Sequence, residues 1–272
     1  MTVLTDRYHR PIDYLRVSIT DRCDLRCIYC TPLGGSPKLN HDDILSYEEF
    51  LHIIQVAVDM GITKVRITGG EPLVRKGVTD FCRRLAALPG LHSLSLTTNG
   101  VMLEEFAQDI YSAGIHRINI SLDTLQPQKF LRITRRDEFH RVWRGIQAAE
   151  TVGFNPIKIN VVVMRGINED EVLDLAKLTL ERTYHIRFIE FMGLNNDSNW
   201  LHEHYVSADE ILANLNGLAP REQITSRHTN GPARHFRWPD AKGVVGIISL
   251  ISHHFCPSCN RIRLTADGKL RN

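Results

Sequence analysis

The sequence contains no long apolar run. None of its 272 residues falls in a stretch approaching the ~20 apolar residues that a membrane-spanning helix needs. Residues 1–6 form neither the hydrophobic segment of a signal peptide nor an Arg- and Ser-rich import leader. Lys and Arg number 33 against 31 Asp and Glu, so the net charge of +2 lacks the excess typical of nucleic-acid-binding proteins. We therefore expect a cytoplasmic protein that binds neither membranes nor nucleic acids.

Cysteines are also few for a chain of this length. Six among 272 residues do not suggest the disulfide framework of a small secreted domain. Three of them nevertheless stand close together, because Cys23, Cys27 and Cys30 are separated by gaps of three and two residues. They follow residues 14–19, whose apolar alternation predicts a β-strand, and so lie on the loop at its carboxyl end. Thiolates gathered on one loop favour a soft metal centre.

The number of thiols in this loop bears on the kind of metal centre. Closed zinc and iron–sulfur sites normally have four protein ligands, and no fourth ligand is adjacent in the sequence. Three ligands would leave one iron of a cluster free to bind a substrate or cofactor. A structural zinc site that takes one ligand from elsewhere in the chain is the alternative, and the spacing alone leaves both open.

Short apolar runs alternate with amphipathic helical patterns along most of the chain. Such alternation indicates repeated βα units and a parallel sheet. We predict an α/β fold in the form of an incomplete (βα)6 TIM-like barrel. The predicted strands are residues 14–19, 64–68, 93–98, 116–121, 157–163 and 185–191.

The pattern changes after the sixth predicted strand. Residues 193–240 are rich in loop signals and lead into one more predicted strand at 243–249. We therefore divide the chain into a barrel over residues 1–192 and a carboxyl-terminal region over residues 193–272 that covers the barrel mouth.

A second pair of cysteines lies near the end of the chain. Cys256 and Cys259 supply two soft ligands, and His253 and His254 stand nearby. By themselves these four residues could form a Cys2His2 zinc site.

Polar residues gather at the predicted carboxyl ends of the strands, where the working residues of parallel barrels lie. Gly69 and Gly70 permit a tight turn and close approach of the backbone to a ligand, with Glu71 available to accept a hydrogen bond from an ammonium group. Lys158 lies inside an otherwise apolar strand, where an unpaired charge is costly. It needs either an anionic ligand or an internal salt bridge, and the sequence leaves both open.

The cysteine spacing, with Tyr29 before the last cysteine, resembles the radical S-adenosylmethionine (SAM) superfamily. Longer segments are similar to the GTP 3′,8-cyclase family of molybdenum cofactor biosynthesis. They are residues 13–23, 66–73, 133–137, 187–192 and 256–265. The resemblance implies a radical SAM lyase that removes hydrogen from ribose C3′ and cyclises GTP to 3′,8-cyclo-7,8-dihydro-GTP. The alternatives are a two-cluster radical SAM enzyme acting on another substrate such as a peptide, and a non-catalytic zinc or iron–sulfur binding module.

The resemblance implies roles for individual residues. A [4Fe–4S] cluster would be held by Cys23, Cys27 and Cys30, and SAM would complete its fourth iron. SAM would contact Tyr29, Gly70, Glu71, Ser121 and Met192. GTP would be bound, with the cations meeting its triphosphate, by Arg16, Arg66, Thr97, Lys158, Arg261, Ile262 and Arg263.

The carboxyl end resembles the family's second cluster site. Cys256 and Cys259 would bind a second [4Fe–4S] cluster, whose third cysteine ligand the family places at the position immediately after Asn272. Residues 261–272 predict a hairpin whose return strand has barely begun, so we expect a truncated carboxyl-terminal iron–sulfur region. The resemblance also implies an electron donor such as flavodoxin or ferredoxin, a homodimer, and transfer of the product to cyclic pyranopterin monophosphate synthase.

Overall fold

The computed structural model describes residues 4–6, 8–32, 34–35, 37–192, 198–217, 222–224, 233–249, 251–253 and 259–271. Within these ranges eleven strands form one sheet, in the order β11-β10-β1-β2-β3-β4-β5-β6-β9-β8-β7. The eight central strands, from β10 to β9, are parallel to one another, and antiparallel strands are added at both sides. The sheet does not close on itself, because β11 and β7 form its two edges.

The six predicted strands are confirmed, each end within one residue of the prediction. They are β1 (Tyr14–Ser18), β2 (Lys64–Thr68), β3 (Ser93–Thr98), β4 (Arg117–Ser121), β5 (Ile157–Val163) and β6 (His185–Glu190). The remaining strands are β7 (Glu222–Ile224), β8 (Ala233–Arg237), β9 (Val244–Ile248), β10 (Arg261–Leu264) and β11 (Leu270–Arg271).

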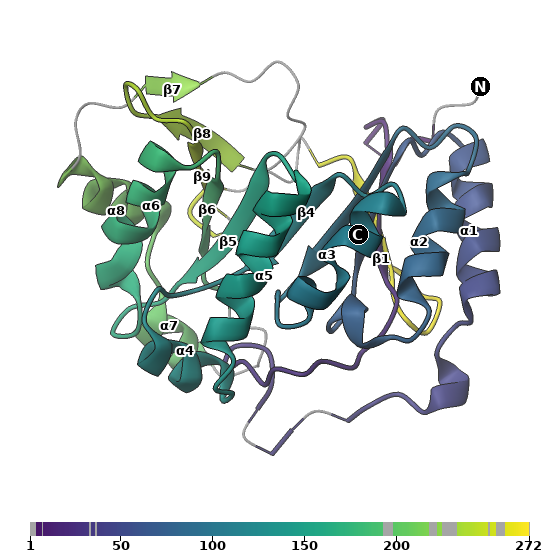
Figure 1. Ribbon diagram of the computed structural model, residues 1–272, viewed down its shortest axis with the longest axis horizontal. Coiled ribbons are helices and arrows are strands. Elements are labelled where there is room, and N and C mark those ends of the chain that lie inside the picture. The colour runs from purple at the N-terminus through teal and green to yellow at the C-terminus, as the bar shows by residue number, and fades with distance from the viewer. Residues whose placement is uncertain are drawn as a thin grey trace.

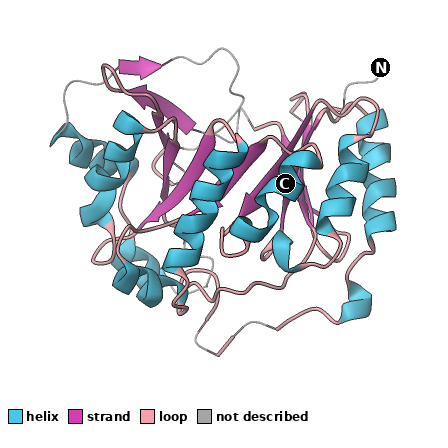
Figure 2. Ribbon diagram, in the orientation of Figure 1, coloured by secondary structure: helices cyan, strands magenta, loops and turns pink. Residues whose placement is uncertain are grey.

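Helices line one face of this sheet, as Figures 1 and 2 show for α1, α2, α3, α5 and α6. The α-helices are α1 (Tyr47–Asp59), α2 (Val78–Ala86), α3 (Leu103–Ser112), α4 (Pro127–Thr134), α5 (Phe139–Val152), α6 (Val172–Glu181), α7 (Ser198–His204) and α8 (Ala208–Asn214). Short 3₁₀ helices are η1 (His41–Asp43), η2 (Pro72–Val74), η3 (Glu169–Glu171) and η4 (Leu215–Gly217). Among the described residues, no helix combines the length and apolar character needed to cross a bilayer.

The strands have one apolar and one polar face. On β1, Leu15 and Val17 are buried in the main apolar core, and alternate residues of a strand point to opposite faces. Arg16 therefore lies on the face away from the helices. The strand register places Arg16 beside Arg66 on β2 and Arg263 on β10. We call this helix-free side of the sheet the inner face.

The inner face is concave. Arg66 on β2 and Arg187 on β6 are separated by three strands, yet the charge of Arg66 lowers the pKa of Arg187 after the larger effect of burial. The Arg187 guanidinium also donates a hydrogen bond to Asn119 on β4. Such contacts require the sheet to curl, which confirms the incomplete barrel.

Residues after 192 complete this sheet on both sides. β9 pairs with β6, and β10 pairs with β1. The antiparallel β10–β11 hairpin confirms the turn expected near Gly268. The boundary at residue 192 stays a prediction, and the described part of the carboxyl-terminal region is continuous with the barrel sheet.

Candidate active site

The three clustered cysteines follow β1 as free thiols. Cys23 and Cys27 are partly buried and Cys30 is exposed. Desolvation by the surrounding protein atoms raises the pKa of all three thiols, that of Cys30 to about 11 although part of this residue is exposed, and the nearby Asp123 carboxylate raises the pKa of Cys27 and Cys30 further. A positively charged centre is therefore needed to hold them as thiolates.

The donor set of the cysteine loop consists of three free thiols. A [4Fe–4S] cluster binds each thiolate on a different iron, so three thiols suit a cluster and leave one iron for another ligand. Within the described ranges, no three His, Cys, Asp or Glu side chains form a group that could hold a single metal ion.

The end of α4 fastens the cysteine loop through the backbone. The Arg26 N–H donates to the Thr134 carbonyl at 3.0 Å, and the Ile28 N–H donates to the Ile133 carbonyl at 2.9 Å. The Arg135 guanidinium donates to carbonyl oxygens just after the third cysteine. Arg135, which directly follows α4, therefore supports the loop.

The glycine turn after β2 lies directly against the chain that enters the cysteine loop. The Gly70 N–H donates to the Thr20 carbonyl and the Glu71 N–H to the Arg22 carbonyl, both at 2.7 Å. A Cβ on Gly70 would lie only 2.1 Å from the Arg22 carbonyl oxygen. Only glycine permits this approach, which fixes the turn beside the cysteines.

The Glu71 carboxylate is fully buried and satisfied within the protein. It accepts hydrogen bonds from the Leu73 N–H (3.0 Å), the Thr98 hydroxyl (2.8 Å) and the Asn99 N–H (2.6 Å). Burial raises the pKa of Glu71 to about 7, although these hydrogen bonds oppose the shift. The carboxylate joins the ends of β2 and β3, and its contact with SAM stays a prediction.

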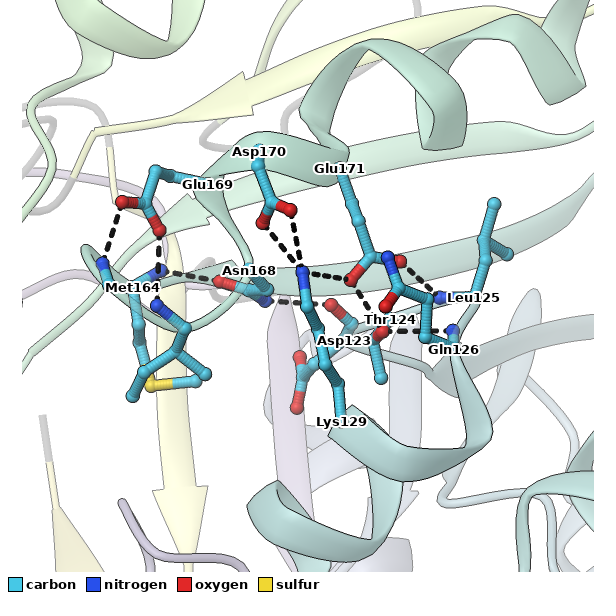
Figure 3. A network of polar contacts seen from close by, with 12 residues as sticks. Asp123, Thr124, Leu125, Gln126, Lys129, Met164, Asn168, Glu169, Asp170 and Glu171 are labelled. Carbon is cyan, nitrogen blue, oxygen red and sulfur yellow. Dashed lines mark hydrogen bonds and ion pairs between the residues drawn. The ribbon is translucent and has the colours of Figure 1, made fainter.

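Asp123 connects the cysteine loop to two strand ends. The Tyr29 hydroxyl donates to Oδ2 of Asp123 at 2.6 Å, and the Val162 N–H donates to Oδ1 at 2.8 Å. The Asn168 amide donates to the carbonyl oxygens of Asp123 (2.7 Å) and Val162 (2.9 Å). Figure 3 shows Asn168, which follows β5, beside Asp123, which follows β4. From the sequence, Asp123 is a carboxylate at a strand end that could hold a ribose or amino-acid group or cap a helix, and its contact with Tyr29 was not predicted.

Glu171 adds further contacts between the residues that follow β4 and those that follow β5 (Figure 3). Its carboxylate accepts from the Thr124 hydroxyl at 2.7 Å and the Leu125 N–H at 2.8 Å. The Lys129 ammonium lies 3.1 Å from the same carboxylate. The loops after β4 and β5 are thus held together at the carboxyl edge of the sheet.

Cations occupy the inner face nearer the amino ends of the strands. Burial and the charges of Arg66 and Arg263 lower the pKa of Arg16 to about 10. Burial and the charges of Arg187, Arg66 and Arg117 lower the pKa of Lys158 to about 8. Among the described residues, the charged groups that act on Lys158 are cations, and its contact with an anionic ligand stays a prediction.

Several buried polar atoms on this face have no hydrogen-bond partner among the described residues. They include Nε of Arg16, Nε of Arg187, Oγ1 of Thr97 and Oδ1 of Asn160. Buried polar groups in proteins are normally paired. A polar ligand with anionic groups would supply acceptors for the two arginine nitrogens, and its hydroxyl groups could donate to Oδ1 of Asn160.

The other residues expected to contact ligands lie in different parts of the sheet. Ser121 is paired with Asn160 at the carboxyl ends of the strands, and Met192 is exposed two residues after the end of β6. Ile262 pairs with Leu15, and its side chain packs against the main apolar core. Only the backbone of Ile262 is therefore available to the inner face.

Cys259 lies at the amino ends of the strands, whereas the cysteine loop lies at their carboxyl ends. It precedes Arg261, which pairs with Tyr14 at the start of β1. Burial alone would raise the pKa of Cys259, but hydrogen bonds from Arg261 and the charges of Arg261 and Arg10 lower it. Cys256 lies outside the described residues.

Three basic residues near Lys158 were not predicted as binding residues from the sequence. Arg187 lies in segment 187–192, which resembles the family, but His185 and His235 belong to no motif. The structure brings all three near Lys158 on the inner face.

Two family models match the chain: the radical SAM superfamily over residues 17–179 and molybdenum cofactor synthesis C over residues 184–272. The GTP 3′,8-cyclase of Petrotoga mobilis is 49% identical over 271 residues, which cover 98% of this chain and 83% of that protein. The chain belongs to the GTP 3′,8-cyclase family. A second family member, from Moorella thermoacetica, is 49% identical over 268 residues with the same coverage of both chains.

Solved structures agree on the fold of this family member. The SAM-bound SuiB of Streptococcus suis superposes with a TM-score of 0.65, over 95% of this chain and 59% of the SuiB chain. The two are 17% identical, so the likeness concerns the radical SAM fold alone.

Proposed function

We propose that this member of the family joins C3′ of the ribose to C8 of the guanine within one GTP molecule, giving (8S)-3′,8-cyclo-7,8-dihydroguanosine 5′-triphosphate. The observation that carries the proposal is the row of buried cations on the inner face. Arg16, Lys158 and Arg187 are held near other cations, with unpaired nitrogen atoms on both arginines. A polyphosphate would neutralise these charges and supply the missing hydrogen-bond acceptors.

The family implies a [4Fe–4S] cluster and SAM. Cys23, Cys27 and Cys30 would hold the cluster, because they are three free thiols on a loop whose backbone is bonded to the end of α4. Bound together, the cluster and SAM supply a carbon radical that takes a hydrogen atom from the substrate.

The chain's own residues bind and orient the two small molecules. Tyr29, Gly70, Ser121 and Met192 would receive SAM at the carboxyl ends of the strands. Lys158 lies four residues before Val162 on β5, about 13 Å along the strand at ~3.3 Å per residue. GTP would thus place its ribose toward SAM and its phosphates toward the cations. Ring closure within one bound molecule depends on this orientation.

We assign the second [4Fe–4S] site to Cys256 and Cys259. Cys259 stands beside Arg261 at the amino ends of β1 and β10. That position is across the inner face from the cysteine loop, so a nucleotide between the two sites would meet both. Arg263 lies four residues after Cys259 and is paired with Arg16 on β1, so these cations would contact the same nucleotide from the inner face.

The partners follow from the reaction. The proposed chemistry needs a one-electron donor, for which flavodoxin or ferredoxin is suited, and delivers its product to cyclic pyranopterin monophosphate synthase. A homodimer is part of the same proposal and comes from the family resemblance.

The test is an anaerobic reconstitution with iron, sulfide, SAM and dithionite, in the presence or absence of GTP. We expect 5′-deoxyadenosine and a cyclised nucleotide to form together only when GTP is present, as measured by mass spectrometry. Lys158→Gln should abolish most of this GTP dependence. Lys177→Gln, which alters an exposed lysine of α6, is the matched control and should behave as the wild type.

The outcomes separate the alternatives. 5′-Deoxyadenosine at the same rate with and without GTP, and no cyclised nucleotide, would refute GTP as the substrate and favour another substrate such as a peptide. Neither product, with zinc bound in place of iron, would instead support a non-catalytic binding module.

A further inference from the structure

Two histidines lie on the inner face beside the cations, His185 at the amino end of β6 and His235 in the middle of β8. His185 begins β6 and is paired in register with Lys158 on β5. His235 on β8 lies opposite Gly246 of β9, and Arg187 lies opposite Gly246 from the other side. The two histidines therefore approach the same basic group from different strands.

Gly246 allows Arg187 and His235 to come together. A Cβ on this glycine would lie 3.1 Å from Cγ of Arg187 and 3.5 Å from Cδ2 of His235. The two side chains thus cover the glycine from both sides. Since Gly246 adds no side chain of its own, the inner face here is lined by basic groups.

The charged neighbours of both histidines are basic. Within the described residues, the strongest charges acting on His185 are those of Lys158, His235, Arg187 and Arg237. Those acting on His235 are Lys158 and Arg187, and Lys158 is itself influenced by cations on β2, β4 and β6. Burial, followed by these charges, lowers the pKa of His185 to about 4 and also lowers that of His235. Both imidazoles are therefore neutral at pH 7 in the ligand-free protein.

A terminal phosphate suits this group better than an inner one. A phosphate monoester carries about −1.5 to −2 charges at pH 7, more than the single charge of a phosphate bridged on both sides. An anion of that charge would raise the pKa of adjacent histidines and convert them into charged donors.

We propose that the terminal phosphate of the bound triphosphate lies at the amino ends of β5 and β6, where His185 and His235 donate hydrogen bonds to it beside Lys158 and Arg187. The assignment rests on the proposed function. It makes the two histidines the residues that select a triphosphate over a diphosphate. Because the phosphate raises the pKa of both imidazoles, GTP binding is accompanied by proton uptake and weakens as the pH rises.

The test is titration calorimetry of GTP and GDP at pH 7, in two buffers with different heats of ionisation. The double variant His185→Gln/His235→Gln should bind GTP about tenfold more weakly, as expected for lost hydrogen bonds to a charged group. Its affinity for GDP should change less than about twofold by the same reasoning. Proton uptake on GTP binding should be smaller than in the wild type. His52→Gln, an exposed position on α1, is the control and should leave all three quantities unchanged.

The result that overturns the inference is a double variant with the wild-type GTP-to-GDP affinity ratio and wild-type proton uptake. SAM binding by the same samples checks that the variant is folded, and the two single variants provide the same comparison if it is not. Tripolyphosphate separates this inference from the proposed function. Wild-type protein that binds tripolyphosphate through the histidines, but does not prefer GTP to other nucleotides, would remove GTP as the substrate and retain the phosphate site.

Discussion

Glu190, at the end of β6, joins the carboxyl-terminal segment to the barrel. Its side chain is 1% exposed. Oε1 accepts from the Ala208 N–H at 2.7 Å and the Tyr205 hydroxyl at 3.2 Å. Oε2 accepts from the N–H groups of Ile251 (2.7 Å) and Ser252 (3.1 Å), and the Ser252 hydroxyl donates to Oε1. One carboxylate therefore holds the start of α8 and the chain that leads toward the second cysteine pair.

Glu190→Gln changes this group by one atom. The amide has one acceptor oxygen, so its NH2 group must face either the Ala208 N–H or the N–H groups of Ile251 and Ser252. A buried donor left without an acceptor costs about 1–3 kcal/mol. We expect the free energy of unfolding to fall by about 2 kcal/mol, since at least one backbone N–H loses its acceptor in either orientation.

Urea unfolding of the metal-free protein measures this loss. Glu181→Gln, an exposed position at the end of α6, is the control and should change stability by less than about 0.5 kcal/mol. Burial alone would raise the pKa of Glu190, but its hydrogen bonds lower it. The ionised carboxylate therefore stabilises the fold fully above its unfolded pKa of about 4.3, and this contribution is lost as the pH falls through the lower folded pKa. Equal stability of wild type and Glu190→Gln at pH 7 would refute the reasoning.

Three further substitutions test the cysteine loop. Gly70→Ala puts a methyl group 2.1 Å from the Arg22 carbonyl oxygen and should displace the turn beside the cysteines. The affinity for SAM, measured by equilibrium dialysis, should fall more than about tenfold, and an unchanged affinity would contradict this. Tyr29→Phe removes the donor to Asp123 and should lower the free energy of unfolding by about 1–3 kcal/mol in urea; no loss would show that the bond is not stabilising. Arg135→Ala removes hydrogen bonds behind the third cysteine, so backbone amides of the loop should exchange with deuterium faster than in wild type.

The strands were predictable because one physical pattern runs through each of them. On β5, Ile157, Ile159 and Val161 are buried in the core while Lys158 and Asn160 alternate with them. Alternation of this kind is local in the sequence, so it survives without knowledge of the neighbouring strands. The predicted strand ends consequently agree with the structure to within one residue.

The basic group at the amino ends was only partly predictable, because it depends on pairing between distant segments. Lys158 stood out as a charge within an apolar strand. His235 lies in a strand that runs antiparallel to β9, after a loop-rich stretch, and its place opposite Gly246 follows from the register alone. No local pattern in the sequence specifies that register.

The family resemblance also implied binding roles for consecutive residues, whose side chains point to opposite faces of the sheet in the structure. Ile262 lies between Arg261 and Arg263, but strand alternation turns its side chain into the core. Glu71 is expected to accept from an ammonium group, which stays a prediction, and its carboxylate also accepts three hydrogen bonds from the end of β3 and from η2. The motif identified the right segments, and the geometry decides what each side chain can reach.

The buried cations should weaken the ligand-free protein. Burial and neighbouring cations lower the pKa of Lys158 from 10.5 to about 8, so the charged lysine destabilises the fold at pH 7. At 1.36 kcal/mol per pKa unit, this destabilisation is at most about 3 kcal/mol. Because the folded pKa is the lower one, the effect is complete below pH 8 and fades as the pH rises toward the unfolded pKa of about 10.4.

Lys158→Met should therefore stabilise the ligand-free protein at pH 7, by up to about 3 kcal/mol in urea unfolding, with a smaller gain above pH 8. The same variant should lose the stabilisation that GTP gives the wild type, which is about 2.7 kcal/mol at a concentration 100 times the Kd. A variant less stable than wild type without ligand would show that Lys158 is paired with an anion inside the protein. A gain in stability together with loss of the GTP effect would mean that the lysine is retained for binding at the expense of the fold.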